Sequence, residues 1–215
     1  MDCSQCHGIE DVFNVKSVEH ELAQYHKRGP EKTTRMLIEA LQAEGVQGLT
    51  LLDIGGGVGA IQHNLIEAGV LKAIDVDASN SYLHAAMQEA NERGISDRIS
   101  FQHGNFIELA PAIPPVDIVT LDRVICCYPD MPDLVRLSAN HARKFYSLVY
   151  PRDAWWVKLG NRFINFFFWL RRESFRTFVH PTQEVDEIIR QSGFERRFTY
   201  RTLIWQVFVY ARSKS

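Results

Sequence analysis

Residues 51–60 read Leu51-Leu52-Asp53-Ile54-Gly55-Gly56-Gly57-Val58-Gly59-Ala60. The apolar run at 49–54 ends at the first glycine, and its length is typical of a buried parallel strand. Residues 61–68 have the pattern of a helix, so the glycines form the turn between the two elements. Glycines there permit positive φ angles and let a ligand approach the backbone closely. Because a bare turn would need only one or two glycines, we predict that this loop binds a ligand.

The rest of the chain alternates between short apolar runs and helical patterns. Strands are expected at residues 49–54, 71–76, 99–102, 116–121 and 145–150, with helices at 61–68, 81–93 and 132–142. This alternation predicts a parallel sheet with right-handed crossovers. A helix at 181–192 then precedes strands at 194–200 and 203–211, whose short connection forces antiparallel pairing. The predicted fold class is α/β: a three-layer sandwich with a mostly parallel seven-stranded sheet and an antiparallel C-terminal hairpin.

Length and composition fit one globular domain. The chain has 215 residues, of which 46% are hydrophobic and 23% charged, and its formal net charge is −2. This charge gives no global attraction to nucleic acid, and we expect no such partner. We expect residues 1–15 to be flexible and residues 16–215 to form a single domain, in which 16–45 supply N-terminal helices.

The N-terminus lacks the pattern of a signal peptide, and no run of about 18 to 20 apolar residues predicts a membrane-spanning helix. We therefore expect a cytoplasmic protein without disulfides. Cys3 and Cys6 resemble half of a zinc site or a haem attachment, but no second pair with this spacing follows. We expect no metal at the functional site, and a loose, reduced terminus is the alternative for the two cysteines.

Two classes of cofactor fit the glycine loop. Gly55, Gly57 and Ala60 match the dinucleotide-binding spacing, and Asp77 lies near the expected ribose-binding position. However, Asp53 directly precedes the glycines, where a carboxylate would repel a pyrophosphate and attract the sulfonium and ammonium groups of S-adenosylmethionine. The predicted terminal hairpin also departs from an all-parallel dinucleotide fold. S-adenosylmethionine is therefore favoured, and a nicotinamide-dependent oxidoreductase is the alternative.

Four segments resemble motifs of the class I, Rossmann-like methyltransferases that use S-adenosylmethionine. They are Asp53-x-Gly55-x-Gly57-x-Gly59, Asp77-Ala78-Ser79, Gly104-Asn105-Phe106 and Asp117-Ile118-Val119-Thr120-Leu121-Asp122. The third departs from the family, which usually has an aspartate where this chain has Asn105. The amide oxygen can still accept a hydrogen bond from an adenine amino group, but without a charge.

The chain is also similar to small bacterial methyltransferases that are distantly like magnesium-protoporphyrin O-methyltransferases and quinone-biosynthesis methyltransferases. This similarity lies in the segments Tyr25 to Pro30, Leu121 to Asp130, Val149 to Asp153 and His180-Pro181. Together the resemblances imply S-adenosyl-L-methionine as cofactor and S-adenosyl-L-homocysteine as product. The cofactor-binding residues that we expect are Tyr25, Asp53, Gly55, Gly56, Gly57, Gly59, Asp77, Ala78, Asn105, Phe106 and Asp122.

Candidate catalytic residues follow the fourth and fifth strands, because ligands bind outside the carboxyl ends of parallel strands. Tyr128 is expected beside the cofactor or the acceptor, unless it simply begins the next helix and packs. Arg152 is expected to hold an acceptor carboxylate, and a salt bridge with Asp153 or Asp130 is the alternative. His180 is the preferred general base, with a surface or capping role as the alternative.

Residues 154–170 carry a wide aromatic surface and a narrow polar stripe at helical spacing. The stripe consists of Lys158, Asn161, Arg162 and Asn165. We predict a helix, within an aromatic-rich insertion at 153–180, that walls the acceptor pocket. Packing in the core, a dimer face, and peripheral contact with a membrane through residues 154–176 are the alternatives.

These patterns together predict an enzyme that methylates a small or medium, hydrophobic small-molecule acceptor. O- or C-methylation is favoured over N-methylation. A non-catalytic module that binds S-adenosylmethionine and a partner protein is a further alternative. The acceptor, the methylated atom, the pathway and the choice between a monomer and a homodimer stay open at this point.

Overall fold

The computed structural model describes residues 14–213 together with Gly8 and Val12. The expectations for Cys3, Cys6 and the flexible N-terminus fall on residues outside this description. Within it, one seven-stranded sheet has the strand order β3-β2-β1-β4-β5-β7-β6. Its strands are β1 (Thr50–Ile54), β2 (Lys72–Asp77), β3 (Ile99–His103), β4 (Val116–Asp122), β5 (Ala142–Pro151), β6 (Phe194–Arg201) and β7 (Trp205–Arg212).

Strand direction follows the prediction. β1 to β5 pair in parallel, whereas β7 is antiparallel to both β5 and β6. The predicted fold class is therefore confirmed: mostly parallel strands end in an antiparallel hairpin. The order of the strands reverses between β1 and β4, which is the switch point where ligands bind in such sheets.

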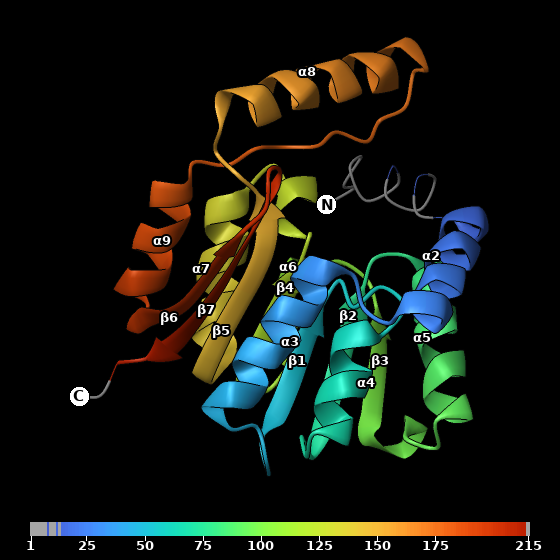
Figure 1. Ribbon diagram of the computed structural model, residues 1–215, viewed down its shortest axis with the longest axis vertical. Coiled ribbons are helices and arrows are strands. Elements are labelled where there is room, and N and C mark those ends of the chain that lie inside the picture. The colour runs from blue at the N-terminus through green and yellow to red at the C-terminus, as the bar shows by residue number, and fades with distance from the viewer. Residues whose placement is uncertain (1–7, 9–11, 13, 214–215) are drawn as a thin grey trace.

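Helices cover both faces of the sheet and form three layers with it (Figure 1). They are α2 (Val15–Arg28), α3 (Lys32–Glu44), α4 (Ala60–Glu67), α5 (Asn80–Glu92), α6 (Phe106–Leu109), α7 (Met131–His141), α8 (Trp155–Leu170) and α9 (Thr182–Gln191). One hydrophobic cluster joins α3, α4 and the end of α5 to the sheet. A second joins α6, α7 and α9 to the opposite face. The sheet is thus buried on both sides, as its continuous apolar strands require.

The helix α2 packs across α5 rather than on the sheet. Val18 and Tyr25 of α2 share a small buried cluster with Val58 of the glycine loop and Tyr82 of α5. α2 begins at Asn14, whose side chain accepts a hydrogen bond from the backbone N–H of Lys16. The first helix of the described domain therefore lies over the loop that decides the fold.

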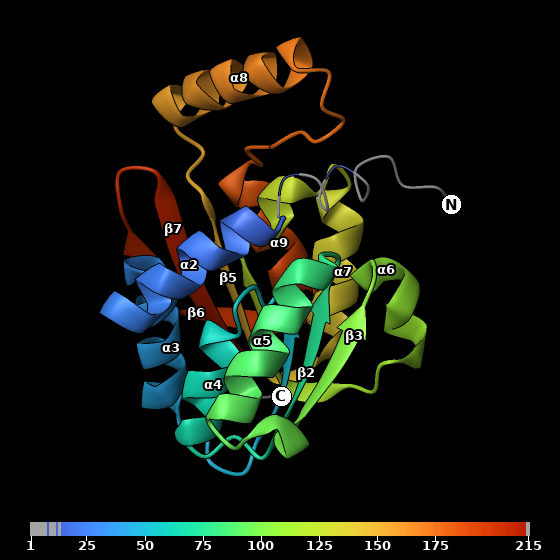
Figure 2. The same cartoon turned by 90° about the vertical axis from the view of Figure 1, so that its right-hand side faces the viewer.

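The helix α8 follows β5 and stands apart from both helical layers, beyond the carboxyl edge of the parallel strands (Figures 1 and 2). On the side that faces the domain, Asn161 and Asn165 each donate a side-chain hydrogen bond to the carbonyl of Thr177, at 2.9 and 2.8 Å, while Val157 is buried and the Phe168 ring contacts that of Phe175. The prediction of a helix at 154–170 is confirmed, but it was predicted to wall the acceptor pocket, whereas none of its residues lines the cavity described below and its aromatic side faces solvent. The reason is the pair of asparagines, whose amides satisfy the backbone hydrogen-bonding groups of Thr177 in the segment between α8 and α9.

The turn between β6 and β7 is longer than expected. The predicted strand at 203–211 begins only at Trp205, because the backbone N–H of Thr202 donates to the Trp205 carbonyl at 2.8 Å. The Thr202 hydroxyl also accepts from the Trp205 N–H at 2.9 Å. This closed turn leaves Leu203 and Ile204 pointing into solvent, with 70% and 49% of their surfaces exposed. Across residues 14–213, no helix has the length and apolarity needed to cross a membrane.

Candidate cofactor and acceptor site

A cavity of about 730 Å3 opens where the carboxyl ends of β1, β2 and β4 meet. Its lining brings together most of the residues predicted from the four motifs and the segment after β4. These are Tyr25, Gly55, Gly56, Gly57, Asp77, Ala78, Asn105, Phe106, Asp122 and Tyr128. The predicted Asp53, Gly59, Arg152 and His180 are not among the lining residues. The cavity thus lies at the switch point that the strand order creates.

The glycine loop needs its glycines for two different reasons. Gly55, Gly57 and Gly59 have φ angles of +67°, +57° and +83°, a region that other L-residues rarely adopt. Gly56 has an ordinary φ, but a Cβ atom there would lie 2.4 Å from Oδ1 of Asp75. The loop therefore turns sharply toward the cavity and presses its backbone against a buried acid from the neighbouring strand.

Three buried carboxyl groups lie behind and beside this loop. Asp53 on β1 is the parallel partner of Asp75 on β2, and Asp77 ends β2. Burial raises the pKa of Asp53 to about 7 and that of Asp77 to about 6, with the neighbouring acids contributing in the same direction. Burial also raises the pKa of Asp75 well above its usual value. A cation placed at the loop would favour the ionised forms of these groups.

Asp77 already orients the loop through its carboxylate. Oδ2 accepts from the backbone N–H of Gly57 at 3.1 Å, and Oδ1 accepts from the N–H of Ser79 at 2.8 Å. Each oxygen of an ionised carboxylate can accept more than one hydrogen bond, so each retains accepting capacity. Since Asp77 lines the cavity, that capacity is available to a pair of hydroxyl groups on a ligand.

Asn105 and Tyr128 meet on the next wall. The Asn105 oxygen caps α6 by accepting from the backbone N–H of Ile107 at 3.2 Å, and its amide nitrogen donates to the Tyr128 hydroxyl at 3.3 Å. Asparagine is favoured at helix N-caps, which explains why this amide is fixed in place. Tyr128 was expected beside the cofactor or the acceptor, and the structure places it on the cavity wall together with Asn105.

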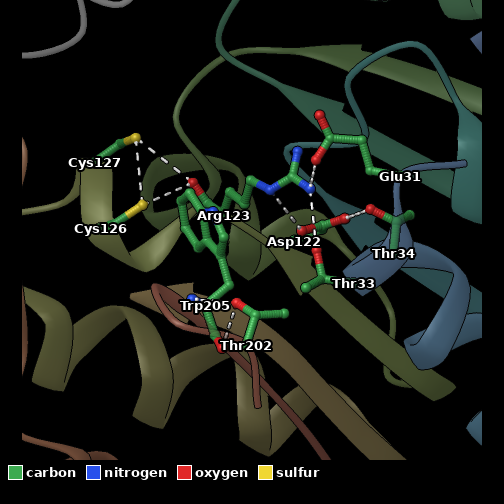
Figure 3. A network of polar contacts seen from close by, with 9 residues as sticks. All are labelled: Glu31, Thr33, Thr34, Asp122, Arg123, Cys126, Cys127, Thr202 and Trp205. Carbon is green, nitrogen blue, oxygen red and sulfur yellow. Dashed lines mark hydrogen bonds and ion pairs between the residues drawn. The ribbon is translucent and has the colours of Figure 1, made fainter. Parts of the chain in front are cut away.

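A polar network closes the opposite wall around Asp122 and Arg123 (Figure 3). Thr34 donates to Oδ2 of Asp122 at 2.5 Å, and burial raises the pKa of Asp122. Arg123 bonds Glu31 and the Thr33 hydroxyl, and its guanidinium lies 5.3 Å from the ring centre of Trp205. This network ties the start of α3 and the C-terminal hairpin to the end of β4.

The sequence did not single out several residues that border the cavity. Arg123 has a φ of +61°, which bends the chain sharply at the end of β4. Glu21 of α2 accepts a hydrogen bond from the Tyr82 hydroxyl at 2.7 Å and lines the cavity beside Gly57. The position of Arg123 directly after a strand was an available signal, but the acidic Glu21 looks like any exposed helical residue.

The two remaining candidates lie outside the cavity lining. The Nε2 of His180 donates to the carbonyl of Ile125 at 2.8 Å, and burial lowers the pKa of its ring. Arg152 donates to the carbonyl of Thr202 at 2.9 Å and lies 5.6 Å from the ring centre of Trp156. Both side chains therefore fasten segments that border the cavity.

Comparisons with known proteins agree with this geometry. A sequence model described as a methyltransferase domain matches residues 46–152. Ribosomal protein L11 methyltransferase of Klebsiella pneumoniae (strain 342) is 31% identical over 71 residues, or 33% of this chain, and the match covers only 24% of that relative. The chain thus spans about a quarter of the length of the curated relatives that it matches first.

Solved structures cover much more of the chain. Magnesium protoporphyrin IX methyltransferase from Synechocystis PCC 6803, with bound SAH, has a TM-score of 0.74 at 19% identity, over 95% of this chain and 98% of that chain. A putative sarcosine dimethylglycine methyltransferase from Galdieria sulphuraria has a TM-score of 0.67 at 14% identity, over 85% and 86% of the two chains. At these identities the similarity establishes the fold. Taken with the matched domain and the motif residues gathered at one cavity, it shows that the chain belongs to the class I S-adenosylmethionine-dependent methyltransferases.

Proposed function

We propose that this protein binds S-adenosylmethionine in the cavity and transfers its methyl group to a small or medium, hydrophobic acceptor. The observation that carries the proposal is the continuity of the cavity. Its lining combines the polar glycine loop, Asp77 and Asn105 with the apolar side chains of Val124, Phe175 and Trp205. One volume of about 730 Å3 is in the range of small-molecule sites and offers room for a nucleoside cofactor and an apolar acceptor side by side.

The polar residues of the cavity lining fit the cofactor. Asp77 retains acceptor capacity for the two ribose hydroxyls, and Asn105 retains a lone pair for an adenine amino group. Asp53 is fully buried, and its Oδ2 has no hydrogen-bond partner among residues 14–213. A nearby cation stabilises the ionised form of a buried carboxyl group that has an oxygen without a hydrogen-bond partner. In their ionised forms, Asp53 and Asp77 would repel the pyrophosphate of a nicotinamide cofactor, so they favour S-adenosylmethionine over that alternative.

When bound, the cofactor supplies an activated methyl group on a sulfonium. The protein then has to align the acceptor with that group and exclude water from it. Val124, Phe175 and Trp205 give the cavity an apolar surface suited to both tasks. Tyr128 is the candidate that faces the cavity, and its hydroxyl is positioned to contact cofactor or acceptor.

A positioning role fits His180 and Arg152 better than contact with the reacting atoms. The hydrogen bond from His180 to the Ile125 carbonyl holds the segment after α8 against the loop that contains Tyr128. Arg152 supports the turn before Trp205 in the same way. Because burial lowers the pKa of His180, its ring is neutral at pH 7 and can keep its donated bond.

Calorimetry and turnover test the proposal in two steps. S-adenosylhomocysteine should bind and NAD should not, and binding of NAD alone would overturn the assignment of the cofactor. Incubation with labelled S-adenosylmethionine and extracts of small molecules should then yield a labelled organic-soluble product. Cofactor binding without turnover on any acceptor would instead favour the non-catalytic module.

A further inference from the structure

We infer that α8 and the turn between β6 and β7 form a docking surface for an anionic lipid bilayer. The outward side of α8 and the adjoining turn are named here the aromatic face. It consists of Trp155, Trp156, Leu159, Phe163, Phe166, Phe167, Trp169, Leu170, Leu203 and Ile204, each with 38% to 72% of its surface exposed. Soluble monomers rarely expose a contiguous apolar patch of this kind without a binding partner.

The aromatic face cannot turn inward without breaking polar contacts. Asn161 and Asn165 bond the carbonyl of Thr177, and their oxygens accept from its hydroxyl at 2.6 Å and its N–H at 2.9 Å. The turn between β6 and β7 is attached to the first turn of α8, where the Trp156 indole donates to the Leu203 carbonyl at 3.1 Å. The helix is therefore anchored through its polar side, and its apolar side is held outward together with Leu203.

The charges around this face select an anionic surface. Between residues 153 and 173 the chain has the cations Lys158, Arg162, Arg171 and Arg172 and two acids, Asp153, which pairs with Lys158, and Glu173, so this segment is net positive although the whole chain has a net charge of −2. A two-fold contact with a second copy would bring these cations toward their own equivalents. A bilayer containing anionic lipids instead attracts each of them, since basic residues beside an apolar helix face favour such surfaces.

The positions of the tryptophans along α8 also fit a helix that lies at the surface of a bilayer. Trp155 and Trp156 lie in the first turn of α8 and Trp169 in the last, and tryptophan is enriched where lipid headgroups meet water. A helix of 16 residues is roughly 24 Å long and would lie flat on the surface. Thr177 and Trp205 line the cavity and adjoin this face, so a lipid-dissolved acceptor would have a short path to it, a step that rests on the proposed function.

Vesicle binding tests the inference without requiring activity. Three of the four tryptophans lie on α8, so intrinsic fluorescence reports on this face. We expect a blue shift and flotation with phosphatidylcholine vesicles that contain phosphatidylglycerol, and much weaker binding to phosphatidylcholine alone. Arg162→Gln with Arg171→Gln should weaken binding to the anionic vesicles by roughly thirtyfold, at about 1 kcal/mol for each cation.

A second pair of variants separates the apolar contribution from folding. Phe163→Ser with Phe167→Ser should reduce vesicle binding at least about tenfold, because both rings are exposed and would be buried in lipid. Leu71→Ser is the matched control: Leu71 is 56% exposed directly before β2, at the opposite edge of the sheet, and should leave binding unchanged. Absence of vesicle binding in the parent protein would overturn the inference, as would a stable dimer that the Phe163 and Phe167 changes dissociate.

Discussion

The glycine loop and α8 occupy the same edge of the sheet, yet each breaks a different rule of folding. Around the loop, Asp53, Asp75 and Asp77 are acids buried in the protein interior. On α8, large aromatic side chains are exposed to water. Natural sequences depart from the usual pattern of buried apolar and exposed charged residues mainly where function requires it. The comparison therefore indicates two partners of opposite character, a small cationic ligand at the loop and an apolar surface at α8.

The two regions also differ in how tightly the protein holds them. Away from the cavity the loop is packed tightly, so that a Cβ atom added at Gly55, Gly56 or Gly59 would lie 2.3–2.5 Å from a neighbouring side chain. α8 is attached to the domain through a few hydrogen bonds to Thr177 and the β6–β7 turn and through the apolar contacts of Val157 and Phe168. Substitutions at the loop should therefore affect folding and ligand binding strongly, whereas substitutions on the outer side of α8 should affect folding very little.

The largest effect is expected for Gly59→Ala. The residue has a φ of +83°, and an added Cβ would lie 2.3 Å from the ring of the buried His63. We expect the free energy of unfolding to fall by about 2–4 kcal/mol, from the strained backbone and the overpacking together. Urea denaturation measures this change. Gly160→Ala is the control, since Gly160 lies in α8 with open space around it, and should be neutral or slightly stabilising.

Asp77→Ala should come next, through cofactor affinity. Two charge-assisted hydrogen bonds to the ribose would be lost, each worth roughly 1.5 to 3 kcal/mol. We expect the dissociation constant of S-adenosylhomocysteine to rise by at least about tenfold in calorimetry. Asp97→Ala removes an exposed acid from the turn before β3 and should not change it. An unchanged constant in a folded Asp77 variant would place the ribose elsewhere.

A smaller effect is expected from the pH dependence of stability. The pKa of Asp53 is raised by burial from 3.8 to about 7, so the folded protein binds this proton more tightly than the unfolded chain. The contribution of Asp53 to the free energy of unfolding of the cofactor-free protein should therefore be largest below about pH 4 and fall between about pH 4 and 7. In urea titrations, Asp53→Asn should reduce the fall in the free energy of unfolding between about pH 4 and 7 by about 1–3 kcal/mol. A slope identical to that of the parent protein would contradict the raised pKa.

The smallest predicted change is on α8. Asn165→Ala leaves the N–H of Thr177 without its partner and should lower the free energy of unfolding by about 1–2 kcal/mol. Phe166→Ala, one residue further along, removes a ring that is 53% exposed and should change stability by less than about 0.5 kcal/mol. Equal effects of the two substitutions would show that the aromatic side is packed, contrary to the contrast between the two regions.

The fold class and most of the polar residues of the cavity follow from local patterns in the sequence. The periods of strands and helices and the short final turn are local properties, so they predicted parallel strands followed by a hairpin. The glycines, Asp77 and Asn105 end or follow consecutive strands, and the topology of such a sheet brings strand ends together. Their presence at one cavity could therefore be predicted from spacing alone.

The residues that enclose the cavity and the orientation of α8 depend instead on contacts between distant parts of the chain. Glu21 and Trp205 reach the site from elements at opposite ends of the chain, and no local pattern marks such long-range contacts. On α8 the periodicity revealed two sides but not their orientation, because hydrophobicity alone predicts that the aromatic side is buried. The hydrogen bonds from Asn161 and Asn165 to Thr177 decide otherwise, since the backbone of the returning segment must be satisfied.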